Sequence, residues 1–364
     1  MPKYKVMEQI YRKNSLGGVG IAYQRMMNSG FFDKYEMQTL EQEEITHGID
    51  IGVIRKYVKE IKQKQPDLIH VRGVTEDGLM PIIAARIAGV KHILIGVEGM
   101  YSDTYEINPV KRVIAKYIIE PLSFSLATDI FTVYEGGLSR PKIARFKKKL
   151  RGYIYNSLPV WDISDRDEIR SEIRGKYKID DGQTVVCFVS RINYDKGFSF
   201  LKDCLISMDT EWPENIEILI VGEGNYLPIL ADEVGKMKNR NRIHILGGQT
   251  DVRQYYLASD VFASCTLHEN HSLSILEACA AHIPSIVTAT GGNTETIQDE
   301  ISGWVIPIKN SIEIEKALKK VSKLTHEQLY DMGEKAYKNG IRKFSPQNSY
   351  LKMQIMYDSI LESD

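Results

Sequence analysis

Hydrophobic residues gather along this chain in short continuous runs, and amphipathic stretches separate the runs. Runs without polar alternation are typical of strands that are buried on both faces of a parallel sheet. The stretches between them, such as 79–88 and 198–208, predict covering helices. Strands are predicted over residues 67–71, 91–97, 129–134 and 153–155, and then over 184–190, 216–222, 243–246, 261–264 and 285–288. This alternation of strands and helices indicates an α/β fold with doubly wound layers.

Two domains are expected, because 364 residues exceed what one hydrophobic core usually serves. The periodicity breaks near 156–162, where the sequence is Asn-Ser-Leu-Pro-Val-Trp-Asp. We therefore predict a first domain over residues 1–157 and a second over 158–345. A final helix is predicted within 346–364, and we expect it to pack back on the first domain.

The composition is that of an ordinary soluble protein, with 43% hydrophobic and 26% charged residues. No run of about eighteen apolar residues and no apolar signal segment occurs, so we expect a cytoplasmic protein without a membrane span. The cysteines, Cys187, Cys204, Cys265 and Cys279, have neither metal-ligand nor disulfide spacing, and reduced thiols are expected.

Charge is distributed unevenly. Residues 1–158 carry 24 Lys and Arg against 17 Asp and Glu, whereas 159–364 carry 23 against 31. The basic excess peaks in a cluster at Lys142, Arg145, Lys147, Lys148, Lys149 and Arg151. Such a cluster is ordinarily a solvated surface, and the alternative is a peripheral contact with anionic lipid or an anionic acceptor. Nucleic acid is not an expected partner, because no aromatic platform accompanies the cluster.

Two cations follow the predicted strand 184–190. Arg191 and Lys196 lie five residues apart, and Gly197 opens the next helix. Open α/β sheets bind ligands at the carboxyl ends of their strands. Arg binds phosphate oxygens bidentately and Lys acts as a mobile point charge, so the pair suits a diphosphate. A pair of surface cations on an ordinary loop is the alternative.

A second group of polar residues follows the strand 261–264. Glu269 lies in a loop, Ser272 is a candidate helix cap, and Glu277 lies within the following helix. The free N–H groups of that helix would bind an anion. Eight helical residues span roughly 12 Å, which suits one carboxylate on a sugar and the other on a ribose across a diphosphate. The alternative places Glu277 on a solvent-facing side of the helix.

Glycine loops complete the candidate chemistry. Gly291 and Gly292 follow the strand 285–288, and Gly17 and Gly18 precede a helix near the start of the chain. Glycine allows the backbone to approach a ligand closely. The string Asp165-Arg166-Asp167 has the form of a metal-binding Asp-x-Asp motif. Its place at the start of a helix instead predicts Ser164 as the cap and the acids as dipole partners, and no metal site is expected.

Together these motifs resemble the retaining glycosyltransferases of the GT-B fold, group 1 or family 4. Arg191 and Lys196 match that family's donor-phosphate cations, and Glu269 and Glu277 match its E-x7-E motif. The glycines at 17–18, 222–224, 247–248 and 291–292 match its loops in the same order. The resemblance implies two Rossmann-like domains that face a cleft. It implies a donor site formed by Gly17, Gly18, Arg191, Lys196, Glu269, His271, Ser272, Leu273 and Glu277.

One departure concerns the acceptor side. The family often carries a His after an early strand, whereas this chain has Glu98 there, and His70 is a less favoured substitute. Glu98, Glu269, Lys196 and Arg191 are therefore our candidate catalytic residues. The expected activity is sugar transfer from a nucleotide-sugar, UDP favoured over GDP, to a glycan or lipid-linked acceptor in bacterial surface polysaccharide synthesis, without cofactor. A catalytically silent partner subunit of the same fold is the alternative.

Overall fold

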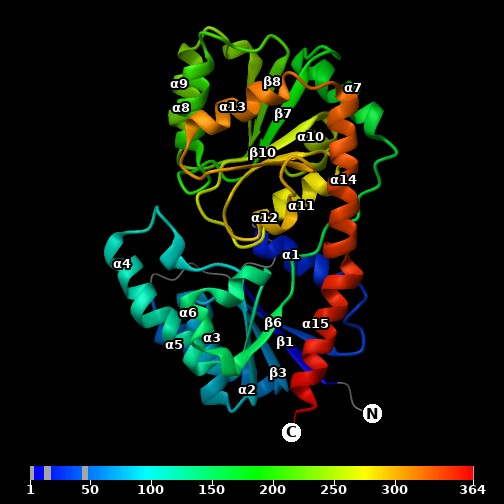
Figure 1. The fold of residues 1–364 in the computed structure, drawn as a ribbon. Helices are drawn as coiled ribbons and strands as arrows, with labels where there is room; N and C mark the ends of the chain where they lie inside the picture. The colour runs from blue at the N-terminus through cyan, green and yellow to red at the C-terminus, as the bar shows by residue number, and fades with distance from the viewer. Residues whose placement is uncertain (1–3, 12–17, 43–47, 364) are drawn as a thin grey trace. The chain divides into compact units, whose positions relative to one another are not determined.

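The computed structural model describes residues 4–11, 18–42 and 48–363, and it divides into two compact units. The first unit comprises residues 1–157 and 346–364, and the second comprises residues 158–345. The final helix therefore belongs to the first unit. Each unit is a parallel sheet with helices on both faces, as the continuous apolar runs predicted (Figure 1).

The first sheet has the strand order β2-β1-β3-β4-β5-β6. Its strands are β1 (Lys5–Tyr11), β2 (Glu36–Gln42), β3 (Leu68–Arg72), β4 (His92–Val97), β5 (Asp129–Thr132) and β6 (Leu150–Tyr153). Its helices are α1 (Gly18–Met27), α2 (Ile51–Lys64), α3 (Glu76–Ala88), α4 (Pro109–Ile114), α5 (Glu120–Leu126), α6 (Pro141–Ala144) and α15 (Pro346–Leu361). A π-helical turn at Ala115–Ile119 joins α4 to α5. Single 3-10 turns lie at Tyr101–Asp103, Glu135–Ser139 and Lys147–Lys149.

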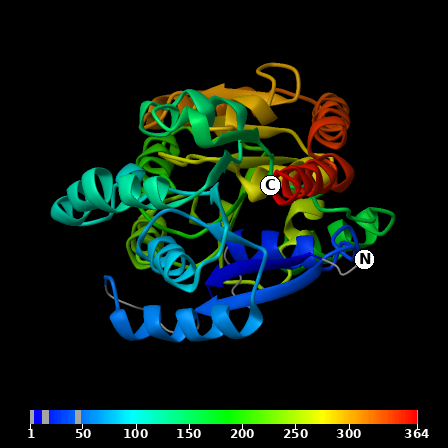
Figure 2. The ribbon, with the colours of Figure 1, turned by 90° about the horizontal axis from the view of Figure 1, so that it is seen from below.

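Two apolar clusters cover the faces of this sheet. Side chains of α2, α3 and α5 pack on one face, and side chains of α1 and α15 pack on the other. Figure 2 shows α15, in red, and α2, in blue, on opposite sides of the strands. The Tyr357 ring of α15 lies within 6.0 Å of the Phe32 ring and 5.8 Å of the Tyr35 ring. Helix α15 is therefore part of the core of the first unit.

The second sheet has the strand order β12-β11-β10-β7-β8-β9. Its strands are β7 (Thr184–Val189), β8 (Ile216–Val221), β9 (Ile243–Gly247), β10 (Val261–Ser264), β11 (Ser285–Thr288) and β12 (Gly303–Ile306). Its helices are α7 (Arg166–Tyr177), α8 (Phe198–Met208), α9 (Leu227–Lys236), α10 (Arg253–Ala258), α11 (Leu273–Ala280), α12 (Asn293–Thr296), α13 (Ser311–Val321) and α14 (His326–Phe344), with a 3-10 turn at Arg240–Arg242.

Three strands were missed by the sequence analysis, namely β1, β2 and β12. Strand β1 contains Glu8 and Gln9, both buried, which interrupt the apolar run. Strand β2 has five polar residues among its seven and lies at the sheet edge, so it has no apolar run. The strand predicted over 153–155 is instead β6, which begins three residues earlier at Leu150. Pairing with neighbouring strands, rather than local hydrophobicity, defines these edges.

Candidate active site

The donor-side candidates meet where the strand order of the second sheet reverses. From β7 the chain runs outward through β8 and β9, and then returns to β10 on the other side of β7. Doubly wound sheets bind ligands at this switch point, outside the carboxyl ends of the strands. Arg191 and Lys196 follow β7, and Glu269 follows β10. The topology therefore brings both predicted groups to one edge.

Backbone contacts hold these two loops together. The carbonyl oxygen of Asp195 accepts hydrogen bonds from Leu267 N at 2.9 Å and Thr266 Oγ1 at 3.3 Å. The Asn193 side chain accepts from Lys196 N at 3.0 Å, which fixes the turn that carries the lysine. Asn193 was not among the predicted residues, and its place before Lys196 was the only signal for it.

Lys196 and Glu269 form an ion pair. Lys196 Nζ donates to Glu269 Oε2 at 2.7 Å, and the two side chains are 22% and 18% exposed. Burial raises the pKa of the Glu269 carboxyl, but the charge and hydrogen bond of Lys196 outweigh burial, so the pKa is lowered overall. Glu269 is therefore an ionised acceptor of hydrogen bonds, and Lys196 is a positioned cation beside it.

Helix α11 begins beside Glu269. Ser272 is its N-cap, and its side chain accepts from Ile275 N at 3.4 Å, as predicted. The helix starts at Leu273, so Glu269 lies in the loop before it and only part of the interval from Glu269 to Glu277 is helical. Leu273 is half-buried in the first turn. The N-terminal amides of α11 offer donors to an anion at this edge.

Glu277 lies inside the fold. Its side chain is buried, and its Oε2 accepts from the Tyr256 hydroxyl at 3.2 Å. The alternative of a solvent-facing Glu277 is therefore wrong. Burial, and then the nearby Glu277 charge, raise the pKa of Tyr256 well above its ordinary value, so the hydroxyl stays a donor. Tyr256 was missed by the sequence analysis, because it lies 21 residues before Glu277 on another helix.

His271 is buried and packs against the Phe344 ring, with a centroid distance of 5.0 Å. Burial lowers the pKa of His271 to about 3, so the imidazole is neutral. It lies next to Glu269 and Ser272 in sequence, but it supplies no positive charge to a diphosphate.

The glycine pair after β11 packs against protein backbone. A Cβ on Gly291 would lie 1.8 Å from the Glu269 carbonyl oxygen, and Gly291 has a φ of +52°. Gly292 N donates to Asn270 O at 2.6 Å. The expected close approach to a ligand is therefore replaced, at Gly291, by a close approach to the Glu269 backbone.

The Gly222–Gly224 turn supports the segment that carries Arg191 in the same way. A Cβ on Gly222 would lie 1.8 Å from Ser190 O, and one on Gly224 would lie 2.2 Å from Ile192 O. Ile192 N also donates to Glu223 O at 2.7 Å. Arg191 itself is exposed between these two backbone contacts.

In the first unit, Glu98 belongs to a buried ionic chain. Arg72 donates to Glu98 at 2.7 Å and to Glu8 at 3.0 Å, and Glu8 also contacts His70 at 3.0 Å. Burial raises the pKa of Glu8, but His70 and Arg72 outweigh it and lower this pKa to about 2. His70 is fully buried, so its side chain does not reach the surface as a substitute for the family histidine.

A pocket of the first unit lies beside this group of ionic side chains. Arg25, Arg72, Glu98, Asn156 and Tyr350 are among its lining residues. Gly18 is the first residue of α1 and is exposed, whereas Gly17 lies outside the described residues. The pocket brings Glu98 together with Asn156, near the end of the first segment of this unit, and with Tyr350 of α15.

Comparison with known proteins finds a family match in the second unit. Residues 169–339 match the family described as glycosyl transferases group 1. The matched residues lie within the second unit, and this part of the chain is similar to the group 1 glycosyltransferases.

Two relatives and one solved structure illustrate the similarity. The chain is 26% identical over 218 residues to an uncharacterized glycosyltransferase of Methanocaldococcus jannaschii, covering 57% of this chain and 53% of that protein. It is 22% identical over 299 residues to the UDP-Gal:alpha-D-GlcNAc-diphosphoundecaprenol alpha-1,3-galactosyltransferase of Escherichia coli, covering 80% of this chain and 75% of that protein. The crystal structure of Anabaena HepE in complex with UDP and glucose superposes with a TM-score of 0.78 at 16% identity, covering 98% of this chain and 100% of that one. The predicted GT-B fold of two Rossmann-like units is confirmed.

Asp165, and not the predicted Ser164, stands at the start of α7. It occupies the N-cap position of α7 without a side-chain cap bond, and its carboxylate pairs with Arg253. The hydrogen bond from Arg253 lowers the pKa of the Asp165 carboxyl. The first carboxylate of the Asp-x-Asp string thus forms an ion pair between the start of α7 and α10.

The basic cluster of the first unit is partly structural. Lys149 donates to the carbonyls of Phe124, Ser125 and Ala127 at the end of α5, at 3.1, 2.6 and 2.7 Å. Arg151 pairs with Asp129, and Lys142 lies 3.8 Å from Asp103 and 3.9 Å from Glu120. The exposed remainder of the cluster is Arg145, Lys147 and Lys148.

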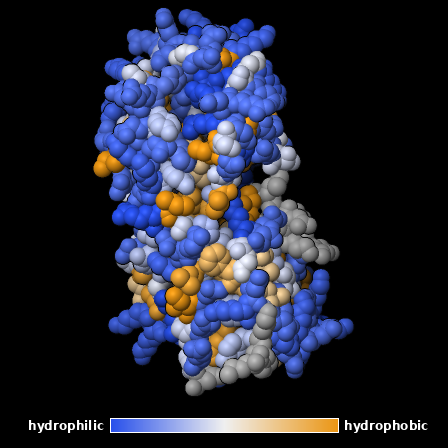
Figure 3. Space-filling view, turned by 90° about the vertical axis from the view of Figure 1, so that its right-hand side faces the viewer, coloured by the Kyte–Doolittle hydropathy of each residue, from blue (hydrophilic) through white to orange (hydrophobic). Residues whose placement is uncertain are grey.

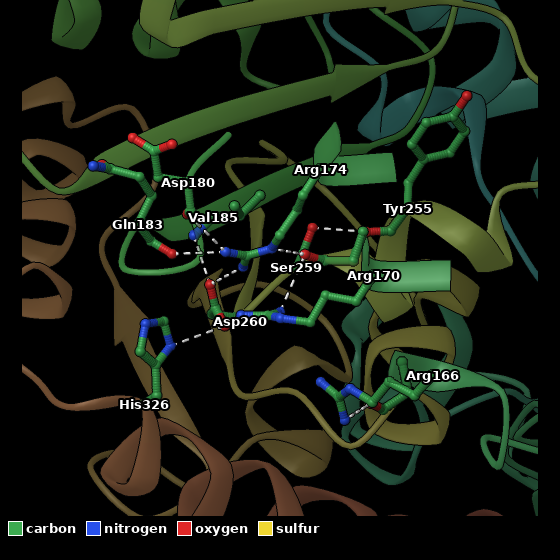
Figure 4. A network of polar contacts seen from close by, with 12 residues as sticks. Arg166, Arg170, Arg174, Asp180, Gln183, Val185, Tyr255, Ser259, Asp260 and His326 are labelled. Carbon is green, nitrogen blue, oxygen red and sulfur yellow. Dashed lines mark hydrogen bonds and ion pairs between the residues drawn. The ribbon is translucent and has the colours of Figure 1, made fainter. Parts of the chain in front are cut away.

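At the amino ends of strands β7 and β10 lies a network that the sequence analysis did not find (Figure 4). Asp260, just before β10, accepts from Arg174 at 2.7 Å and Arg170 at 2.6 Å, and Val185 N donates to it at 2.7 Å. Burial raises the pKa of Asp260, but the bonds from His326 and both arginines lower it well below its usual range. This network joins α7, β7, β10 and α14, far along the strands from Glu269.

Proposed function

We propose that the protein transfers a sugar from a UDP-sugar to a glycan or lipid-linked acceptor, with retention of the anomeric configuration. The observation that carries the proposal is the Lys196–Glu269 pair at the β7–β10 switch point, beside the N-terminus of α11. A cation, a carboxylate and free backbone donors at one sheet edge suit a sugar diphosphate.

Each residue then has a role. Arg191, Lys196 and the first turn of α11 stabilise the charge that builds on the leaving diphosphate. Glu269 holds hydroxyls of the transferred sugar, and Glu277, fixed by Tyr256, holds the ribose. The leaving phosphate oxygen accepts the proton of the acceptor hydroxyl as the new glycosidic bond forms. These cations make a metal unnecessary in the proposed transfer.

The relatives support the choice of donor and acceptor. HepE was crystallised with UDP and glucose, and the E. coli relative is named for UDP-Gal and a diphosphoundecaprenol-linked acceptor. We propose a UDP-sugar rather than a GDP-sugar and a role in surface polysaccharide synthesis on the same basis. Glu98 lines a pocket of the first unit, which supports an acceptor-side role for it.

Thermal unfolding with UDP, GDP, ADP and CMP tests the donor assignment, beside an Arg191→Ala/Lys196→Ala double variant. A ligand at a hundred times its dissociation constant stabilises by about 2.7 kcal/mol. For a domain of this size, each kcal/mol of stabilisation raises the unfolding midpoint by roughly 2–4 °C. We expect UDP to raise the midpoint of the second unit in the wild type and not in the variant.

Turnover of UDP-sugars, followed as UDP release, then tests catalysis. Retention is checked by the anomeric configuration of the product in NMR spectra. A UDP shift without turnover against any acceptor would favour the silent partner subunit. No shift with any of the four nucleotides would overturn the donor site.

A further inference from the structure

An exposed apolar stripe lies on the helical segment 109–122 of the first unit. Six of its side chains are between 40% and 66% exposed: Val110, Val113, Ile114, Tyr117, Ile118 and Leu122. On the face shown in Figure 3, by contrast, most of the surface is hydrophilic and apolar side chains appear in separate groups. Contiguous exposed apolar surface marks a site of interaction with a protein or a membrane.

Helical spacing places these residues on one side. Positions 110, 113, 114, 117 and 118 follow the i, i+3, i+4, i+7, i+8 pattern of a single helix face. The π-helical turn at Ala115–Ile119 rotates less per residue than an α-helix, so Leu122 stays in line with the others. Ala115, Ile119 and Phe124 are buried on the other side of the helix. The stripe therefore faces away from the core of its own unit, and α4 reaches outward in Figures 1 and 2.

The exposed charges within the segment 109–122 are all positive. Lys111, Arg112 and Lys116 are the charged residues of 109–119, and Lys111 and Lys116 are exposed. Glu120 is buried, and its carboxylate accepts from Ser102 N at 2.9 Å and Ser102 Oγ at 2.7 Å. No acidic side chain of the segment therefore offsets the cations at its surface.

The exposed cations of the basic cluster lie on a neighbouring part of the first unit. Phe146 packs on Phe124 of α5 with a ring distance of 5.3 Å, which brings the exposed Arg145, Lys147 and Lys148 to the same part of the unit. Basic residues near a membrane surface attract anionic headgroups, while apolar side chains enter the interface.

We propose that the segment 109–122 docks the protein on an anionic lipid surface, with the apolar stripe entering the headgroup region. A second copy of this chain fits less well, because a two-fold contact through the stripe would bring Lys111, Arg112 and Lys116 against their own copies. Anionic lipid neutralises the same charges. The inference deepens the proposed function, since a lipid-linked acceptor would lie at that surface. In the part of the chain that the structure describes, no helix is long and apolar enough to cross a bilayer.

Co-sedimentation with vesicles tests the proposal. The full-length protein is mixed with phosphatidylcholine vesicles, with or without phosphatidylglycerol, at low and high salt. We expect binding to the anionic vesicles, weakened by salt. Val113→Gln/Tyr117→Gln/Ile118→Gln is expected to lower the partition coefficient by at least about tenfold, because these side chains would no longer enter the interface.

Matched controls separate this effect from a general loss of apolar surface. Ile229→Gln/Ile312→Gln/Ile355→Gln removes three apolar side chains that are 49%, 63% and 58% exposed on other helices, and it should bind vesicles like the wild type. Lys111→Gln/Lys116→Gln should lose most of the preference for anionic vesicles. Equal binding by the stripe variant and the control, or no binding by the wild type, would overturn the proposal.

Two further measurements keep the outcome unambiguous. Sedimentation velocity without lipid reports self-association, and a dimer that only the stripe variant dissociates would overturn the lipid assignment in favour of a second copy. The UDP-induced thermal shift is recorded for every variant and should not change, because none of the substituted residues belongs to the proposed donor site. A normal UDP shift with failed vesicle binding would refute the docking surface and leave the proposed donor site standing.

Discussion

At the residue scale, the Lys196–Glu269 pair carries the proposed chemistry. Glu269 is held ionised by a cation 2.7 Å away, and both side chains remain partly exposed. An ion pair with a purely structural role could lie anywhere in the fold. This pair lies at the edge where doubly wound sheets bind ligands. Its function can therefore be separated from its contribution to stability.

Removal of either partner should abolish most of the turnover. Lys196→Ala and Glu269→Ala are each expected to lower kcat by at least about a hundredfold, which is typical of losing one transition-state contact. Steady-state kinetics with the UDP-sugar that turns over provides the measurement. Lys236→Ala, which removes an exposed lysine paired with Asp232 and Glu233, is the control. Near-normal rates in either active-site variant would defeat the assignment.

Tyr256 is expected to act on the donor through Glu277. Tyr256→Phe removes the 3.2 Å hydrogen bond to the buried carboxylate and leaves the ring packing intact. We expect UDP to bind at least about tenfold more weakly, since a hydrogen bond to a charged group contributes about 1.5–3 kcal/mol. Calorimetric titration of UDP measures the change, and Glu277→Gln should reproduce or exceed it. An unaltered affinity in both variants would mean that Glu277 is only structural.

Glu8 should make the first unit sensitive to acid. Its pKa is lowered from 4.5 to about 2 in the folded protein, so the unfolded state binds more protons in that range. The stabilisation is complete above the unfolded value of 4.5, and it is lost as the pH falls toward 2.

Comparison with Glu8→Gln across pH measures this effect. At neutral pH the variant should be less stable by roughly 3–5 kcal/mol, because Arg72 and His70 lose their buried counter-charge. The difference in unfolding midpoint of the first unit should narrow below about pH 4.5. A difference that stays constant from pH 7 to pH 3 would contradict the lowered pKa.

At the element scale, glycine turns position the loops that carry charge. Gly291 and Gly222 each leave no room for a Cβ beside the backbone of a neighbouring loop. The two loops are those of Glu269 and Arg191. The turns therefore set the distance between sheet-edge segments that are far apart in sequence.

Gly291→Ala should damage the donor site. Its Cβ would lie 1.8 Å from Glu269 O, and its φ of +52° is strained for alanine, so the Glu269 loop must shift. We expect the UDP-induced thermal shift to fall to less than half, with a fall in midpoint of a few degrees. Gly235→Ala in α9, where no atom lies within 4 Å of the added Cβ, should raise stability slightly. An unchanged UDP shift in Gly291→Ala would refute the positioning role.

At the scale of the whole molecule, the two units are linked by a chain that leaves the first unit and returns to it. Helix α15 supplies Tyr350, Met353, Met356, Tyr357 and Ile360 to the core of the first unit. Tyr357 also reaches the ionic chain of Glu8 and His70, at 2.7 Å from His70 Nδ1. The first unit is thus built from both ends of the sequence.

Truncation after Ser345 should unfold the first unit and spare the second. Each buried Met, Tyr or Ile contributes roughly 1.5–3 kcal/mol, and five of them approach the whole stability of a domain. Limited proteolysis should degrade residues 4–157 and leave a fragment near 158–345 whose melting transition still shifts with UDP. Deletion of residues 362–364 alone is the control and should change neither. A protease-resistant first unit in the truncated protein would contradict the assignment of α15 to its core.

The hydrophobic pattern alone determined the α/β class and most strands of the second unit, because strands buried on both faces give continuous apolar runs. Motif spacing placed Arg191, Lys196, Glu269 and the Ser272 cap at one sheet edge, because parallel strands carry their following loops to the same side. These inferences need only local sequence and the rules of parallel sheets.

Tertiary structure decided everything that depends on partners distant in sequence. Strand β1 was missed because Glu8 is tolerated in a core only with Arg72, His70 and Tyr357 around it. Glu277 became a buried residue through Tyr256, and Gly291 proved to make room for Glu269. The exposed stripe of 109–122 was also invisible in the sequence, since apolar residues at helical spacing ordinarily face a core. Which side of a helix is covered is settled only by the packing of the whole unit.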